Sequence, residues 1–280
     1  MRKLIVAVIL ILLVGGAYVK RGEIKNWVVE WQKPDVPAVA YQEGDEESEE
    51  SVDDTLTGNV EESTDDQAAA DVTTDEDADE PDDTETTDAA LPAEYNLAVP
   101  FTSQAPKSIW DEVHEETCEE ASSLMAAYYF QGLPAGKVDS DQAEADLLKM
   151  VDFENSFFGF YKDTTTEQTA TLIETYFQLS TEVLVNPTVM QIKQALVDGH
   201  PVIVPAAGRQ LGNPNFTGEG PLYHMLLIKG YTADGFITND PGTRLGADYF
   251  YTFDVIMNAM HDWNDGDVAN GQKIVIVVTP

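Results

Sequence analysis

The pattern of apolar and polar positions divides the chain into three stretches. Residues 4–19 are apolar without interruption, and residues 34–90 contain almost no large apolar side chain. From about residue 94 onward, apolar positions recur at the spacings of helices and strands. The pattern therefore predicts an N-terminal segment (1–33), a disordered linker (34–93) and one globular domain (94–280).

The first half of the domain has apolar positions at helical spacing, as at Ala121, Leu124, Met125 and Tyr128. The second half consists mainly of short apolar runs separated by turn residues, including the hairpin signal at residues 234–235. Helices followed by an antiparallel sheet are typical of the α+β class. The expected helices are residues 117–130, 139–151, 166–177, 188–197 and 254–260, the expected strands are residues 97–101, 181–185, 202–204, 224–230, 236–238, 249–253 and 273–278, and residues 153–161 are an expected aromatic loop.

The apolar run at 4–19 follows two basic residues and is typical of a segment that enters a membrane. A helix of this length extends roughly 24 Å, slightly less than the ~30 Å hydrocarbon core. Two interpretations remain open: an uncleaved single-pass anchor, or a signal peptide cleaved after the small residues Gly15-Gly16-Ala17. Trp27 and Trp31 suit a membrane interface and favour the anchor. Under either interpretation the domain is expected to be extracytoplasmic, held at the membrane or secreted.

The chain carries 51 acidic and 15 basic residues, for a formal net charge of −36. Nucleic acid is therefore not an expected partner, because phosphate binding requires clustered Lys and Arg. No Lys or Arg lies between Lys33 and Lys107, whereas residues 43–88 hold 22 Asp and Glu. Their spacing does not match a calcium-binding EF-hand loop. We interpret the stretch as a solvated spacer with a reach of roughly 40 Å, which charge repulsion extends further.

Cys118 is the only cysteine of the chain and lies at the predicted start of a helix. A helix N-terminus lowers the pKa of a thiol because it places partial positive charge beside the sulfur. One cysteine cannot form an internal disulfide, so the thiol is a reactive group, an intermolecular partner or a small buried apolar side chain. The adjacent Glu119 and Glu120 oppose formation of the thiolate.

His224 opens the longest apolar strand pattern and follows a loop rich in Gly and Pro, from which a general base can be presented. Asp240 follows the next strand, and a hairpin with its tip at residues 234–235 would bring the two side chains to the same end. A carboxylate there can orient the imidazole, and the amide of Asn239 is an alternative. The Asn-Asp-Pro-Gly sequence is also typical of a plain turn. The weaker histidine candidates are His114, His200 and His261.

Six short segments of the domain occur together in a recognisable order. They are Val99-Pro100-Phe101-Thr102-Ser103-Gln104, Trp110, Cys118 to Met125, Gly199-His200-Pro201-Val202-Ile203-Val204, Tyr223-His224-Met225 to Tyr231, and Asn239-Asp240-Pro241. Together they resemble papain-like cysteine peptidases, in particular the stand-alone, peptidase-like branch of the bacteriocin-processing (double-glycine) type, cysteine peptidase family 39. The resemblance covers about residues 94–280.

The resemblance implies a papain-like fold in which N-terminal helices pack on an antiparallel sheet. It further implies that Cys118 is the nucleophile, that His224 is the general base and then the acid, and that Asp240 orients His224. Gln104 would donate to the oxyanion hole together with the backbone N–H of Cys118. No cofactor or metal is implied, and the expected substrate is a peptide or protein.

Two features depart from the family pattern. Glu119-Glu120 stands where the family commonly has Gly-Pro after the cysteine, and Gln104 lies fourteen residues before Cys118. Two functions are therefore weighed. The first is an exported, membrane-tethered cysteine peptidase, and the second is a catalytically inactive papain-like binding module displayed at the cell surface.

Overall fold

The computed structural model describes residues 30, 32–43 and 90–280. The apolar run at 4–19 and most of the acidic linker lie outside these residues. Within the described ranges, no helix is long and apolar enough to cross a membrane.

The α-helices begin within one residue of the predicted positions, and all of them except α3 start with a side-chain cap. Asp139 caps α4 by accepting from the backbone N–H groups of Asp141 and Gln142, and Thr165 and Thr188 form capping boxes at α5 and α6. The helices are α3 (Cys118–Phe130), α4 (Ser140–Phe157), α5 (Thr166–Leu172) continued by the π-helical turn η1 (Ile173–Phe177), α6 (Val189–Val197) and α7 (Phe253–Ala259), with the short 3₁₀ turns η2 (Gly208–Leu211) and η3 (Val268–Asn270).

Helix α4 runs beyond the expected end at residue 151 and includes the first part of the segment expected to be an aromatic loop. The ring of Phe153 stacks on Phe157 at 5.3 Å and meets the edge of Tyr176 at 5.2 Å. These contacts give the extra helical turns an apolar surface to cover, so tertiary packing outweighs the loop-like composition.

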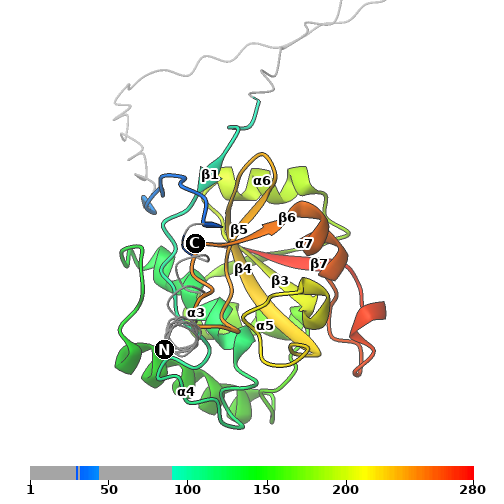
Figure 1. Cartoon of the computed structure of the whole chain (residues 1–280). Helices are drawn as coiled ribbons and strands as arrows, with labels where there is room; N and C mark the ends of the chain where they lie inside the picture. Colours follow the sequence, from blue (N-terminus) through cyan, green and yellow to red (C-terminus); the bar gives the residue numbers. More distant parts are fainter. Residues whose placement is uncertain (1–29, 31, 44–89) are drawn as a thin grey trace, which may run out of the picture. The chain divides into compact units, whose positions relative to one another are not determined.

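The strands form one antiparallel sheet in the order β2-β7-β3-β4-β5-β6, with β1 also paired to β4 (Figure 1). The α+β class predicted from the sequence, with helices preceding an antiparallel sheet, is therefore confirmed. The strands are β1 (Tyr95–Asn96), β2 (Ser180–Val185), β3 (Val202–Ala207), β4 (Tyr223–Tyr231), β5 (Gly235–Asn239), β6 (Tyr249–Thr252) and β7 (Ile274–Thr279).

The edge strand expected at residues 97–101 is wrong in its position. The paired strand is β1, two residues earlier, and Leu97 forms only an isolated bridge with Val39. Val39 donates its backbone N–H to Asn96 O at 2.8 Å and accepts from Ala98 N at 2.7 Å. The backbone of this segment therefore pairs with residues that come before the domain in the sequence.

Residues 34–42, which we call the strap, lie in the same compact unit as residues 91–280 although the sequence places them in the linker. The amide of Asn96 donates to Val36 O at 3.0 Å. The ring of Tyr41 meets Tyr129 and Phe130 edge-on at 5.6 and 5.0 Å. The folded unit therefore begins before the acidic stretch 44–89.

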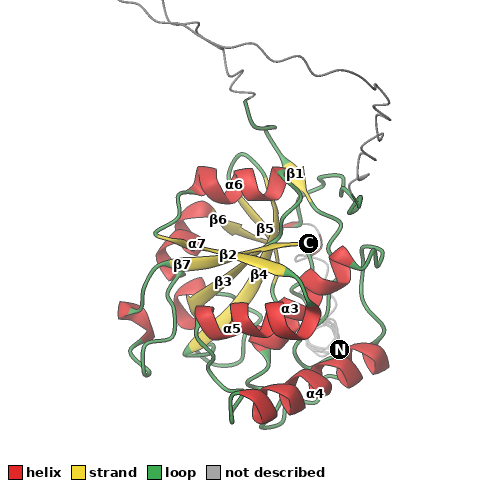
Figure 2. Ribbon diagram, turned by 180° about the vertical axis from the view of Figure 1, so that it is seen from behind, coloured by secondary structure: helices red, strands yellow, loops and turns green. Residues whose placement is uncertain are grey.

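The centre of the sheet positions the candidate site. Strand β4 is buried along its whole length, and helix α3 packs against it. Figures 1 and 2 show α3, α4 and α5 on one side of the sheet and α6 on the other. As a result, the first residue of α3 lies over the first residues of β4, which the sequence separates by about a hundred positions.

Candidate active site

Cys118 is the first residue of α3 and follows the N-cap residue Thr117. Its sulfur accepts a hydrogen bond from the backbone N–H of Met225, at 3.3 Å, which ties the start of α3 to β4. The thiol is free and only 5 % of the residue is exposed. The predicted position at a helix N-terminus is therefore present in the structure, at a buried location.

His224 and Asp240 are joined directly. His224 is the second residue of β4 and Asp240 follows the last residue of β5, and the pairing of Leu227 with Asn239 brings these ends together. His224 Nε2 lies 2.8 Å from Asp240 Oδ1, and both side chains are buried. Burial alone would raise the pKa of Asp240, but the charge of His224 and the hydrogen bonds that Asp240 accepts lower it below its usual value.

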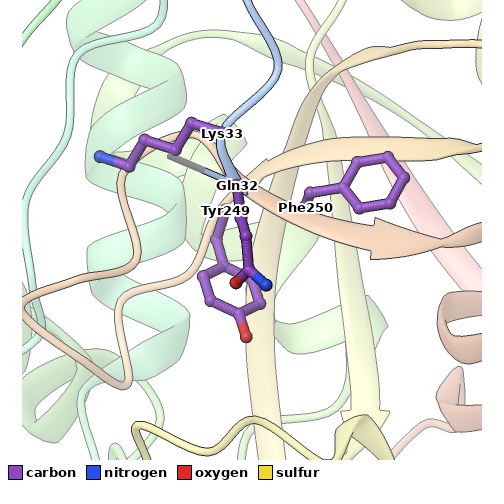
Figure 3. A pocket seen from close by; sticks show the side chains of 4 residues that line it. All are labelled: Gln32, Lys33, Tyr249 and Phe250. Atoms are coloured by element: carbon purple, nitrogen blue, oxygen red, sulfur yellow. The ribbon is translucent and has the colours of Figure 1, made fainter. Parts of the chain in front are cut away.

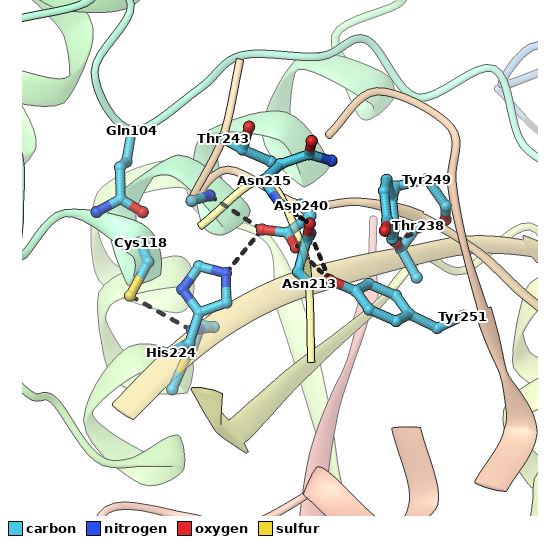
Figure 4. Close-up of polar contacts among 12 residues, drawn as sticks. Gln104, Cys118, Asn213, Asn215, His224, Thr238, Asp240, Thr243, Tyr249 and Tyr251 are labelled. Carbon is cyan, nitrogen blue, oxygen red and sulfur yellow. Dashed lines mark hydrogen bonds and ion pairs between the residues drawn. The ribbon is translucent and has the colours of Figure 1, made fainter. Parts of the chain in front are cut away.

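The second ring nitrogen of His224, Nδ1, faces Cys118, as Figure 4 shows. Because Nε2 carries the proton that is donated to the carboxylate, Nδ1 is the nitrogen left to accept a proton. Among the described residues no hydrogen bond joins the thiol to this imidazole; the thiol instead donates to Glu119 Oε2 at 3.0 Å. The Cys118 thiol thus lies beside His224, its candidate base, but is hydrogen-bonded to Glu119, the next residue in the chain.

Burial, together with the contact with Glu119, keeps the resting thiol uncharged. Burial raises the pKa of Cys118 well above its usual value, the charge and hydrogen bond of Glu119 raise it further, and the Met225 N–H lowers it. The pKa of Glu119 is itself raised by burial and by the charge of Glu120. The resting thiol is therefore protonated at neutral pH.

Glu120 points away from the thiol and belongs to another cluster. It lies against Glu154 of α4, and both side chains are fully buried. Their four carboxyl oxygens have no hydrogen-bond donor elsewhere in the described protein. Two buried carboxyl groups in contact need a shared proton. Of the two glutamates only Glu119 is hydrogen-bonded to Cys118, whereas Glu120 acts on the pKa of the thiol through its charge alone.

Gln104 lies beside Cys118 in Figure 4 and is tied to both halves of the site. Its backbone N–H donates to Pro241 O at 3.0 Å, and its carbonyl accepts from Thr117 Oγ1 at 3.1 Å. Its side-chain amide donates to His114 O at 2.8 Å. An amide nitrogen has two N–H groups, so one remains available to a bound group. The fourteen-residue separation therefore does not keep Gln104 away from Cys118.

The other candidates have different partners. The Asn239 amide donates to Val99 O and Pro100 O, at 3.3 and 3.0 Å, so it braces the backbone rather than the imidazole. His114 Nδ1 lies 2.7 Å from Asp111 Oδ1, and His261 Nδ1 lies 2.8 Å from Gly271 O. Neither histidine contacts Cys118.

Four residues at the site were not found from the sequence. Tyr251 and Asn213 donate to Asp240, and the ring of Phe216 meets His224 edge-on at 5.4 Å. Gly242 lies so close to His224 that an added Cβ would come within 2.8 Å of the imidazole. The only sequence signal for these residues is their presence in the loop and hairpin that flank the histidine strand, which does not distinguish them from their neighbours.

Within the described residues no group of three or more His, Cys, Asp and Glu side chains is placed to hold a metal ion. Two surface pockets lie next to the strap rather than at the thiol. One, of about 280 Å³, is lined by Gln32, Lys33, Tyr249 and Phe250 (Figure 3). The other, of about 230 Å³, lies beside the strap and includes Lys229, whose ammonium contacts Asp248 at 2.8 Å.

Comparison with known families identifies the family of the domain. The model of the Peptidase_C39 like family matches residues 96–266, more than half of the chain. The chain belongs to this family. The matched range of this C39-like peptidase contains Gln104, Cys118, His224 and Asp240.

A solved structure from Bacillus anthracis, provisionally described as a C39-like peptidase, is also similar. It is 16% identical, covers 67% of this chain and 98% of its own, and has a TM-score of 0.44. No curated protein matches the C39-like peptidase described here. Membership of the family suggests a cysteine peptidase.

Proposed function

We propose that the chain is an active cysteine peptidase with a Cys118–His224–Asp240 triad. The observation that carries the proposal is the position of the His224 imidazole between two groups: Asp240 lies 2.8 Å from one ring nitrogen, and the other ring nitrogen faces the Cys118 thiol. Such an arrangement lets one imidazole take the thiol proton while its tautomer is held by a carboxylate.

In the proposed reaction, His224 Nδ1 takes the proton of Cys118, and the thiolate attacks the carbonyl carbon of the scissile peptide bond. The negative oxygen that forms is stabilised by the backbone N–H of Cys118 and the free amide N–H of Gln104. The imidazolium then protonates the leaving amine, which leaves a thioester on Cys118. Water, deprotonated by His224, hydrolyses the thioester and restores the thiol.

Activation of this thiol involves Glu119. In the resting state the thiol donates to Glu119 Oε2 at 3.0 Å, and the charge of Glu119 in its ionised form opposes a thiolate. Movement of the carboxylate away from the sulfur, or its protonation, would leave the thiol to His224. The proposed enzyme therefore reacts from a neutral Cys118–His224 pair rather than from a stored ion pair.

The architecture and location belong to the same proposal. The domain at 94–280 is proposed to be papain-like, with α3 carrying the nucleophile and the sheet carrying His224 and Asp240. Residues 1–33 are proposed to act as a membrane anchor or export signal, and the acidic stretch to act as a tether. The substrates would then be extracytoplasmic peptides or proteins, and the acidic tether and domain argue against nucleic acid as a partner.

A second candidate is a binding module without catalysis. It is favoured by one observation: the thiol is buried, protonated and hydrogen-bonded to Glu119 instead of His224. In this case the papain-like scaffold would present a surface, and Cys118 would serve only as a small buried side chain.

Labelling of the full-length protein with a peptide that carries a thiol-reactive group distinguishes the two candidates. A peptidase should label at Cys118, and His224→Ala should reduce the rate by about 100-fold or more because the general base is lost. His261→Ala is the matched control and should label at the wild-type rate. Labelling no faster than a free model thiol at pH 7, with no effect of His224→Ala, would support the binding module.

A further inference from the structure

Asp240 is a completely buried carboxylate with more hydrogen bonds than its role toward His224 requires. Oδ1 lies 2.8 Å from His224 Nε2 and accepts from the backbone N–H of Gly242 at 3.0 Å. Oδ2 accepts from Tyr251 Oη at 2.6 Å and from Asn213 Nδ2 at 2.9 Å. Four donors occupy about all the acceptor positions of an ionised carboxylate, so the ion is buried without the loss of its hydrogen bonds.

The two oxygens of Asp240 have different partners. Oδ1 faces the imidazole, whereas Oδ2 faces Tyr251 and Asn213 on the other side, as Figure 4 shows. Rotation of the carboxylate about its Cβ–Cγ bond moves both oxygens together, so Oδ1 cannot leave His224 without breaking the two hydrogen bonds to Oδ2. The hydrogen bonds from Tyr251 and Asn213 to Oδ2 therefore fix the orientation of the Asp240 carboxylate.

The directions of these hydrogen bonds follow from the neighbouring contacts. Asn213 Oδ1 accepts from the backbone N–H of Asn215 at 2.9 Å, so its NH₂ group is the end that faces Asp240. The same NH₂ donates to Tyr251 Oη at 2.7 Å. Because Tyr251 Oη accepts from Asn213, its own proton is directed to Asp240 Oδ2. The direction of every hydrogen bond in this small network is therefore fixed.

The two donors are held by different parts of the chain. Tyr251 lies on β6, paired with Phe236 of β5, and its hydroxyl is therefore placed by the sheet. Asn213 lies in the loop after η2, three residues before Phe216, whose ring contacts His224. The loop thus contacts the imidazole through one side chain and the carboxylate through another.

We propose that Tyr251 and Asn213 are positioning residues that keep Asp240 ionised and directed toward His224. The inference rests on the proposed function for its effect on reactivity, while the network itself is present whether or not the thiol reacts. Neither residue touches Cys118 or a substrate, and each acts through the carboxylate. Both hydrogen bonds are charge-assisted, but that of Tyr251 is the shorter, at 2.6 Å against 2.9 Å for Asn213, so loss of the Tyr251 donor is expected to be the larger effect.

The first test is the pH dependence of Cys118 alkylation by iodoacetamide in the full-length protein. Tyr251→Phe should slow the reaction roughly tenfold at pH 7. It should also shift the acid limb of the pH–rate profile to higher pH by about one unit, because Asp240 loses a hydrogen-bond donor to its ionised form. Asn213→Ala should change both in the same direction by less. Tyr249→Phe is the matched control: its ring packs on Tyr251 at 4.8 Å, but its hydroxyl is not among the four donors to Asp240. Profiles for Tyr251→Phe and Asn213→Ala that match the wild type would overturn the inference.

The second test does not depend on a reactive thiol. In ¹⁵N-labelled protein the imidazole Nε2 proton of His224, held by Asp240, should exchange with solvent at least severalfold faster in Tyr251→Phe and Asn213→Ala than in the wild type or Tyr249→Phe. Unchanged exchange in both variants would overturn the inference. A wild-type thiol that alkylates like a free thiol, together with faster exchange in Tyr251→Phe, would reject the proposed peptidase but support the positioning network.

Discussion

The buried carboxyl pair of Glu120 and Glu154 predicts a specific dependence of stability on pH. Burial raises the pKa of Glu154 from an ordinary 4.5 to about 8, and the charge of Glu119 raises it while the hydrogen bond with Glu120 lowers it. A carboxyl whose pKa is higher in the native chain stabilises the fold fully below pH 4.5. This contribution is lost as the pH rises toward 8, because the native state then has to release a proton that the unfolded chain has already lost.

The size of the effect follows from the shift. One proton changes the free energy of unfolding by about 1.4 kcal/mol per pH unit, so the interval from 4.5 to about 8 corresponds to a loss of roughly 5 kcal/mol. Glu154→Gln replaces one carboxyl by an amide that donates to Glu120 at every pH. Glu120 remains buried with its own raised pKa, so we expect the variant to recover part of the loss, about 2 kcal/mol relative to wild type at pH 8.

Urea unfolding followed by circular dichroism between pH 5 and pH 9 measures this difference. The curves for wild type and Glu154→Gln should diverge as the pH rises, with the variant the more stable at alkaline pH. Asp152→Asn is the matched control because it removes an exposed carboxylate from the same helix. Parallel curves for wild type and Glu154→Gln would refute the shared-proton interpretation.

Three further predictions concern the thiol, the ring of Phe216 and the strap. Glu119→Gln replaces the carboxyl group 3.0 Å from the thiol by an amide that cannot ionise, and should raise the alkylation rate at pH 7 roughly tenfold; an unchanged rate would exclude Glu119 as the group that restrains the thiol. Because the ring of Phe216 lies against His224, Phe216→Ala should speed labelling by a bulky peptide reagent severalfold more than labelling by iodoacetamide, and an equal effect on both would show that the ring does not restrict access to the site. Tyr41→Ala should lower Tm by about 2–4 °C through loss of the ring contacts with Tyr129 and Phe130, and an unchanged Tm would show that the strap contributes nothing to stability.

The parts of the fold that the sequence predicted have strong local signals. The hairpin of β4 and β5 was found from two apolar runs around Asp234-Gly235, and with it the approach of Asp240 to His224. The start of α3 at Cys118 was found from apolar spacing. In each case the pattern that forms the element also fixes the position of the polar residue at its end.

The parts that the sequence did not predict depend on contacts between distant segments. Strand β1 and the strap pair across more than fifty intervening residues, and the end of α4 is set by Phe153 against Tyr176. Likewise, nothing local indicates that Tyr251 would reach Asp240, or that Glu120 would meet Glu154 while Glu119 turned to the thiol. From the sequence, two consecutive glutamates are expected to affect Cys118 in the same way. Their different partners follow only from the packing of α3.

The acyl intermediate is the most direct test of the proposed chemistry. Full-length protein is mixed with an activated peptide ester, quenched in acid within milliseconds to seconds, and analysed by intact mass and peptide mapping. The account predicts a thioester on Cys118 that is absent in Cys118→Ser and strongly reduced in His224→Ala, whereas His261→Ala behaves as wild type. Ester cleavage that persists in Cys118→Ser, with no mass added to Cys118 in the wild type, would contradict the account.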